Sequence, residues 1–281
     1  MNNIKIKVFS SLNRNMNKLK WPHPILIKEQ IELNGYAIVE KVLNKSKIKK
    51  IKLEIDSLYK KEIKNFGFKK LKKINDLGVV RSPYLSSNTI ANEIFSKFVL
   101  SVNEIFFKEQ YILHVNRAIV NSKKFTHATS VWHREPPYQN FTTNDPVALT
   151  FVHFINKNSK KNGGLKILKS SHKWPTFPSE NFVFRNSEIP EIKEGSLLIF
   201  DSALFHAASN NNFSTRRTLV TIFSSPLFKQ QINLSKIVDL KKKHNYLKKI
   251  KNIKFILGLT TNPMYSDEEY RSKKLKMKKK I

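Results

Sequence analysis

Three residues of the kind that bind metal ions occur in a pattern typical of a metal centre. His133 and Glu135 are separated by one residue in the segment WHREP, and residues i and i+2 of a strand project to the same face. Pro136 favours extended backbone at Glu135. His206 follows a short apolar segment, Ser196–Phe200, that predicts a buried strand. Two imidazoles and one carboxylate leave three octahedral positions open, which suits Fe(II) with a bidentate co-substrate and O2.

Two adjacent arginines follow the second histidine. Arg216 and Arg217 come ten and eleven residues after His206, at the start of the predicted strand Thr218–Phe223. Neighbouring residues of a strand point to opposite faces, so only one of the two can enter a barrel. Inside it, an arginine can bind a carboxylate with two parallel hydrogen bonds, which lysine does less well. The alternative is that both are surface cations of a basic protein.

The order of these motifs resembles the phytanoyl-CoA dioxygenase family of Fe(II)/2-oxoglutarate oxygenases. The segments that carry the resemblance are WHRE, NGGLKILKSSHKW and IKEGSLLIFDSALFHAASNNNFSTRRTLVTIF, and it covers about residues 25–226. The resemblance implies that His133, Glu135 and His206 bind the iron. It also implies that Arg217 binds the distal carboxylate of 2-oxoglutarate, with Arg216 in that role if the register differs by one residue.

The implied activity is hydroxylation of a small organic substrate, with release of succinate and CO2. The family usually has Asp where Glu135 stands, and the longer side chain can still bind a metal. Halogenating relatives have Ala or Gly there, so the retained carboxylate disfavours halogenation. His172 matches a family histidine that is not a metal ligand, and we expect a structural role for it. Three cations near the motif would suit an anionic substrate: Lys123, Lys124 and Arg134.

The charge of the chain has two interpretations. Lys and Arg number 52 against 21 Asp and Glu, a net charge of +31, but only eight of the basic residues are arginine. Arginine is the residue preferred for reading bases or gripping phosphates, so a solvated lysine-rich surface is favoured. The alternatives are a barrel without catalysis that binds a membrane or nucleic acid through its lysine-rich flanks, 61–73 and 241–254, and the same oxygenase chemistry on a macromolecule.

Composition excludes several classes of protein. The chain has no cysteine, which excludes disulfides, thiolate zinc sites and iron–sulfur clusters. No apolar run approaches the roughly 18–20 residues that cross a bilayer. The N-terminal segment has charges throughout and no apolar core typical of a secretory signal. These observations predict a cytoplasmic protein.

The positions of the expected elements predict a mainly β fold with flanking helices. Helices are expected at 25–33, from 45 onward and at Ile90–Phe107, and loops with short strands at 61–88. Short β-branched and aromatic runs then predict an all-β barrel or sandwich, and the family resemblance narrows this to a double-stranded β-helix (jelly-roll, cupin-like) barrel. These runs are Tyr111–Val115, Ala118–Asn121, Ala148–Ile155, Leu165–Leu168, Ser196–Phe200 and Leu219–Phe223.

This organisation predicts three parts. Residues 1–24 form a basic leader. Residues 25–226 form the oxygenase domain, with a helical and mixed part at 25–108 and the barrel at 109–226. Residues 227–281 form a basic C-terminal extension that is partly helical, at 235–258, and ends in a disordered lysine-rich tail, Arg271–Ile281.

Overall fold

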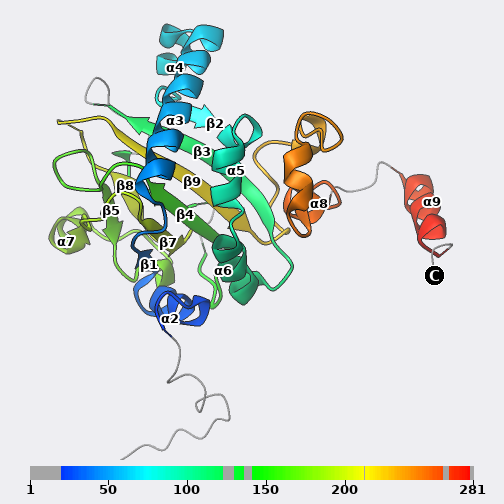
Figure 1. Cartoon of the computed structure of the whole chain (residues 1–281). Helices are drawn as coiled ribbons and strands as arrows, with labels where there is room; N and C mark the ends of the chain where they lie inside the picture. The colour runs from blue at the N-terminus through cyan, green and yellow to red at the C-terminus, as the bar shows by residue number, and fades with distance from the viewer. Residues whose placement is uncertain (1–19, 123–129, 136–140, 212, 262–265, 279–281) are drawn as a thin grey trace, which may run out of the picture.

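The computed structural model describes residues 20–122, 130–135, 141–211, 213–261 and 266–278. An antiparallel six-stranded sheet with the order β1-β7-β4-β9-β3-β2 forms its centre (Figure 1), and a three-stranded sheet with the order β6-β5-β8 packs on one face of it. Together they form the predicted jelly-roll barrel. The strands are β1 (Tyr36–Val39), β2 (Val79–Arg81), β3 (Ile112–Asn121), β4 (Ala148–Phe154), β5 (Leu165–Leu168), β6 (Ser187–Glu188), β7 (Leu197–Asp201), β8 (His206–Ala208) and β9 (Arg216–Ser224).

The central strands are covered on both faces, which explains their continuous apolar sequences. In β7, Leu197 and Ile199 join the core beneath the helices, while Leu198 and Phe200 pack between the two sheets. A strand that is buried on both sides loses the usual alternation of polar and apolar residues. The predicted buried strand Ser196–Phe200 is therefore confirmed, beginning one residue later.

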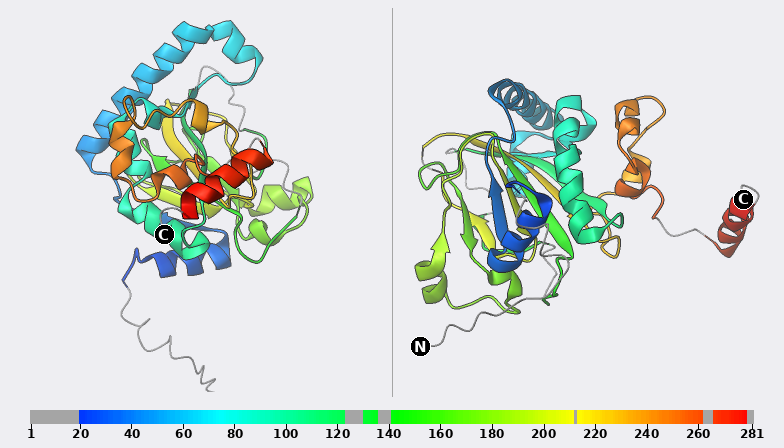
Figure 2. Two further views of the ribbon diagram at one scale, coloured as in Figure 1. Left: turned by 90° about the vertical axis from the view of Figure 1, so that its right-hand side faces the viewer. Right: turned by 60° about the horizontal axis from the view of Figure 1, so that its bottom comes forward.

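Helices cover the outer face of the large sheet (Figure 2). In α3, Ile48, Ile51 and Ile55 are buried at the expected helical spacing, and Asn44 caps the helix by accepting a hydrogen bond from the amide of Lys47 at 2.9 Å. The covering helices are α2 (Pro24–Asn34), α3 (Lys45–Phe66), α5 (Asn88–Ile94) and α6 (Lys97–Phe107). This layer fixes the sheet so that its other face can carry the site.

Two predictions about the N-terminal half are wrong. The region 61–88 was expected to be loops with short strands; β2 is such a strand, but α3 continues to Phe66 and α4 covers Phe68–Lys73. Lysine is a good helix former, so a lysine-rich stretch does not end a helix. The expected single helix Ile90–Phe107 is two helices, because Ser96 caps α6 by accepting from the amide of Val99.

The C-terminal extension is less helical at its start and more helical at its end than predicted. Residues 235–258 contain short 3-10 turns and α8 (Ile253–Ile256). The tail forms α9 (Asp267–Lys278), where disorder was predicted from Arg271 onward. Its first turn is acidic and lysines follow, which complements the helix dipole. Of the predicted leader, residues 1–19 lie outside the described residues. No helix in the described ranges has both the length and the apolar character to cross a membrane.

Candidate active site

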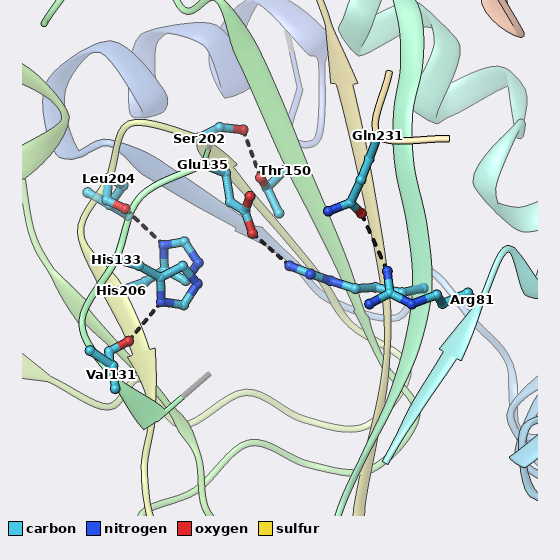
Figure 3. A network of polar contacts seen from close by, with 10 residues as sticks. Arg81, Val131, His133, Glu135, Thr150, Ser202, Leu204, His206 and Gln231 are labelled. Atoms are coloured by element: carbon cyan, nitrogen blue, oxygen red, sulfur yellow. Dashed lines mark hydrogen bonds and ion pairs between the residues drawn. The ribbon is translucent and has the colours of Figure 1, made fainter. Parts of the chain in front are cut away.

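Two predicted ligands, His133 and His206, are brought together by backbone pairing. Each donates its amide to the carbonyl of the other at 3.0 Å, and their ring centroids are 4.3 Å apart. A further backbone bond holds the same segment, because the amide of Glu135 donates to the carbonyl of Ser202 at 2.7 Å. Residues 73 positions apart in the chain therefore share one wall, as Figure 3 shows for the two imidazoles and the Glu135 carboxylate beside them.

The hydrogen bonds of both imidazoles leave their Nε2 atoms available. Nδ1 of His133 lies 2.8 Å from the carbonyl of Val131, and Nδ1 of His206 lies 2.9 Å from that of Leu204. A carbonyl oxygen only accepts, so each Nδ1 carries a hydrogen, which leaves Nε2 as the ring atom that can bind a metal. Burial, with a smaller contribution from His133, lowers the pKa of His206 well below its ordinary value. A neutral imidazole anchored through Nδ1 is the usual form of a metal-binding histidine.

The third predicted ligand, Glu135, faces the same space but is bonded to an arginine. Nη2 of Arg117, in β3, donates to Oε1 of Glu135 at 2.7 Å. In the described part of the chain, no three histidine or carboxylate side chains converge closely enough to hold a metal ion. The structure thus assembles two of the three predicted ligands and turns the third toward Arg117.

A cavity between the two sheets joins these residues, and we call it the central cavity. It contains about 520 Å³ of space free of atoms, counting the open solvent at its mouth. Seven of the thirteen described residues that line it are polar. The polar lining residues are Arg117, His133, Glu135, Thr150, His206, Arg216 and Thr218, and the apolar ones are Ile119, Val152, Leu165, Phe200, Ala208 and Val220.

The structure corrects the choice between the two arginines of β9. Arg216 lines the central cavity together with Thr218, whereas Arg217 points to the opposite face of the strand. There Arg217 forms a bidentate ion pair with Asp56 of α3, with Nε–Oδ1 at 2.6 Å and Nη2–Oδ2 at 3.0 Å. The implied placement of Arg217 in the barrel is wrong: neighbouring residues of a strand face opposite sides, and Arg216, the alternative, takes the cavity side.

Arg216 is buried and held in place by the turn that contains Gly163. Its Nε and Nη2 both donate to the carbonyl of Gly163, at 3.0 and 2.8 Å. Gly163 has a φ of +70°, and a Cβ there would lie 2.7 Å from both the Asn121 amide nitrogen and Cβ of Asn211. Burial lowers the pKa of Arg216 to about 10, so the guanidinium stays charged at neutral pH. It is a fixed cation on the wall of the central cavity.

Other predicted residues lie elsewhere. Arg134 is buried away from the central cavity, where its guanidinium stacks 3.8 Å from the ring centre of Phe205 and donates to the carbonyl of Trp174. It packs the core and does not suit an anionic substrate. Lys123 and Lys124 lie outside the described residues. His172 is buried against Gly35, with Nε2 at 3.3 Å from the carbonyl of Glu32, in keeping with the expected structural role.

Sequence reasoning missed Arg117 as a site residue. It lies 18 positions before Glu135, and nothing between them in the sequence indicates that they meet. The available signal was weak: arginine is scarce in this chain, and Arg117 lies between the predicted β segments Tyr111–Val115 and Ala118–Asn121. Thr150 was missed as well, and its Oγ1 lies 2.8 Å from Oγ of Ser202, next to the segment that carries His206 (Figure 3).

The donor set fits an Fe(II) ion with a keto-acid co-substrate. Two imidazoles have free Nε2 atoms, a carboxylate stands within the same cavity, and a buried guanidinium is fixed on its wall. Imidazole and carboxylate are ligands that suit non-haem iron. A jelly-roll barrel with this set of side chains around one interior cavity defines the class of the protein as a non-haem iron oxygenase.

The family follows from comparison with known sequences. The sequence model of the phytanoyl-CoA dioxygenase family matches residues 31–218, so the chain belongs to that family, whose members use Fe(II), 2-oxoglutarate and O2. Two proteins described as uncharacterized, Mb1539 of Mycobacterium bovis and Rv1501 of Mycobacterium tuberculosis, are each 24% identical over 211 residues, covering 74% of this chain and 77% of theirs. The predicted domain boundaries at 25 and 226 stay predictions.

Solved structures share the fold. EctD from S. alaskensis, crystallised with 2-oxoglutarate and 5-hydroxyectoine, matches with a TM-score of 0.62 at 15% identity, over 76% of this chain and 81% of that chain. The non-heme alpha ketoglutarate dependent epimerase SnoN from nogalamycin biosynthesis matches with a TM-score of 0.55 at 13% identity, over 72% and 83%. The double-stranded β-helix predicted from the sequence is thereby confirmed, and the chain is a 2-oxoglutarate-dependent non-haem iron oxygenase by family and fold.

Proposed function

We propose that the protein hydroxylates a small organic molecule, with His133, Glu135 and His206 as the iron ligands and Arg216 as the partner of the distal carboxylate of 2-oxoglutarate. The observation that carries this proposal is the pairing of two imidazoles, each anchored through Nδ1 with Nε2 left to bind a metal, on one wall of the central cavity. Iron with 2-oxoglutarate and O2 supplies the oxidising chemistry when bound.

The side chains of the central cavity have separate tasks in this scheme. The carbonyls of Val131 and Leu204 keep the two imidazoles in the ligating tautomer. Arg216, fixed by the carbonyl of Gly163, orients the co-substrate by its far carboxylate. The apolar wall, with Phe200 as its largest member, limits the access of water to the reacting carbon.

The test is an anaerobic titration of the metal-free protein with Fe(II) and 2-oxoglutarate. We expect the visible charge-transfer band of the chelated complex to appear with one iron per chain. His206→Ala and Glu135→Ala should each remove the band and iron-dependent succinate formation. His153→Leu is the matched control, because His153 is also buried in the barrel but does not line the central cavity.

Retention of full turnover in His206→Ala would overturn the ligand assignment. Absence of a band in the folded wild-type protein would instead favour a basic barrel without catalysis, which binds a membrane or nucleic acid. An oxygenase that acts on a macromolecule would lose activity steeply with salt, because lysine contacts to a polyanion release counterions. We expect weak salt dependence, as for a small substrate. The cytoplasmic location remains a prediction.

A further inference from the structure

A second cavity lies beside the central cavity, and Arg117 belongs to the wall of both. We call it the side cavity, and its polar wall includes Arg81, His114, Arg117 and Gln231. Arg81 of β2 is paired directly with Arg117 of β3, and the side chains of such a cross-strand pair project to the same face of the sheet. Both side chains therefore start from the same face of the sheet, where Arg117 reaches Glu135 and Arg81 reaches Asp76.

Several polar atoms of the side cavity lack hydrogen-bond partners. Nη2 of Arg117 donates to Glu135, but its Nε is buried without a partner among the described residues, as is Nδ1 of His114. Nη1 of Arg81 reaches Oε1 of Gln231 only at 3.5 Å. Buried polar groups are normally paired, so the side cavity is incomplete without a further group rich in oxygen.

The charges of this region balance only while Glu135 pairs with Arg117. Arg81 forms a bidentate ion pair with Asp76, with Nε–Oδ2 at 2.9 Å and Nη2–Oδ1 at 2.6 Å. Arg117 has Glu135 as its counter-ion. A carboxylate that binds a metal ion shares its negative charge with that ion, so a partly buried guanidinium would keep an unpaired positive charge, which is unfavourable. An anion from elsewhere would restore the balance.

We propose that Arg117 binds an anionic group of the substrate, a carboxylate or a phosphate, and that this group and Glu135 compete for the guanidinium. Assigning the anion to the substrate rests on the proposed function. Because Arg117 lies on the wall of both cavities, an anion held there places the attached carbon skeleton in the central cavity beside the imidazoles. The substrate class is a small organic acid or a phosphate monoester, and its affinity depends on whether Glu135 is engaged elsewhere.

The test removes the charge of Glu135 without any metal. Acetate and inorganic phosphate are titrated separately into the metal-free full-length chain by calorimetry, at fixed ionic strength. Glu135→Gln keeps the shape of the side chain but no longer neutralises Arg117. We expect the Kd of at least one probe to fall about tenfold or more relative to wild type, as charge-assisted hydrogen bonds to Arg117 become available. The probe whose Kd falls identifies the anionic group that Arg117 binds.

A second substitution locates the anion. Arg117→Gln in the Glu135→Gln background should abolish the gain, and Arg117→Lys should retain a part of it, because the charge remains without the planar fork. Arg217→Gln in the same background is the matched control, since Arg217 lies on the other side of the sheet and should leave the gain intact. Urea unfolding of each variant shows that it is folded.

Two results would overturn the proposal. One is an unchanged Kd for both probes in Glu135→Gln, and the other is a gain that survives Arg117→Gln, which would place the anion at Arg216. Neither iron nor 2-oxoglutarate takes part in this measurement. A positive result together with no charge-transfer band would therefore refute the proposed function while leaving the anion site standing.

Discussion

The two neighbouring arginines of β9 give a sharp test of the co-substrate site, because one faces the central cavity and the other faces α3. The perturbation is Arg216→Lys, which keeps a positive charge but replaces the planar guanidinium by a point charge. Arg216 is 4% exposed and its Nε and Nη2 hold the carbonyl of Gly163. Lysine cannot hold that carbonyl and offer a second parallel bond to a carboxylate.

The expected magnitude follows from the bonds that are lost. A hydrogen bond to a charged group contributes about 1.5–3 kcal/mol, so the Kd for 2-oxoglutarate should rise about 10- to 100-fold in Arg216→Lys. Arg217→Lys should change that Kd by less than about twofold. Arg217 pairs with Asp56 of α3 on the other face of the sheet, so its loss does not touch the co-substrate.

The assay is the anaerobic titration of 2-oxoglutarate into each iron-loaded variant, followed by the charge-transfer band. Urea unfolding accompanies it, because the loss of the bond from Arg216 to the Gly163 carbonyl should lower the free energy of unfolding by about 1 kcal/mol. A raised Kd in Arg217→Lys with an unchanged Kd in Arg216→Lys would refute the reasoning. It would favour Arg217 as the partner of 2-oxoglutarate, as the family resemblance implies.

Two further predictions concern stability. Burial lowers the pKa of His153 to about 4, so the unfolded chain binds the proton first as the pH falls below 6.5. The free energy of unfolding should then decrease by up to about 3 kcal/mol between pH 6.5 and 4. The difference between wild type and His153→Leu in urea unfolding at several pH values isolates this contribution, and a constant difference would contradict it. Gly163→Ala, at φ +70° with a Cβ 2.9 Å from the Ser209 carbonyl, should lower the free energy of unfolding by about 2 kcal/mol or more and also weaken 2-oxoglutarate binding by displacing the carbonyl that holds Arg216. If Gly163→Ala is destabilised but binds 2-oxoglutarate with an unchanged Kd, the turn does not position Arg216 for the co-substrate.

Features that depend on local sequence could be predicted. The buried strand Leu197–Asp201 and the buried face of α3 follow from short-range apolar patterns. The proximity of His133 and His206 was anticipated only through the family resemblance, because the chain itself does not show that 131–135 runs antiparallel to 202–206. The side-chain direction of Arg134 could have been predicted, since the residue between His133 and Glu135 must face the opposite way.

The arginine register could not be read from sequence. Arg216 and Arg217 differ only in which face of β9 they occupy, and that is set by pairing with β3 and β4. A shift of one residue exchanges the faces at no cost to the local pattern. The outcome is decided at long range, by Asp56 on α3 on one side and by the carbonyl of Gly163 on the other.

This chain has Glu135 where the family usually has aspartate, and the longer side chain is what reaches Arg117. The backbone of Glu135 is anchored by its amide to the carbonyl of Ser202, so the reach of its carboxylate is set by side-chain length. The additional methylene extends that reach by about 1.5 Å, and the carboxylate bonds Nη2 of Arg117 at 2.7 Å. An aspartate on the same backbone would fall short of this contact. The longer ligand therefore couples the predicted metal site to the side cavity, and the engagement of Glu135 by iron and of Arg117 by an anion become linked equilibria.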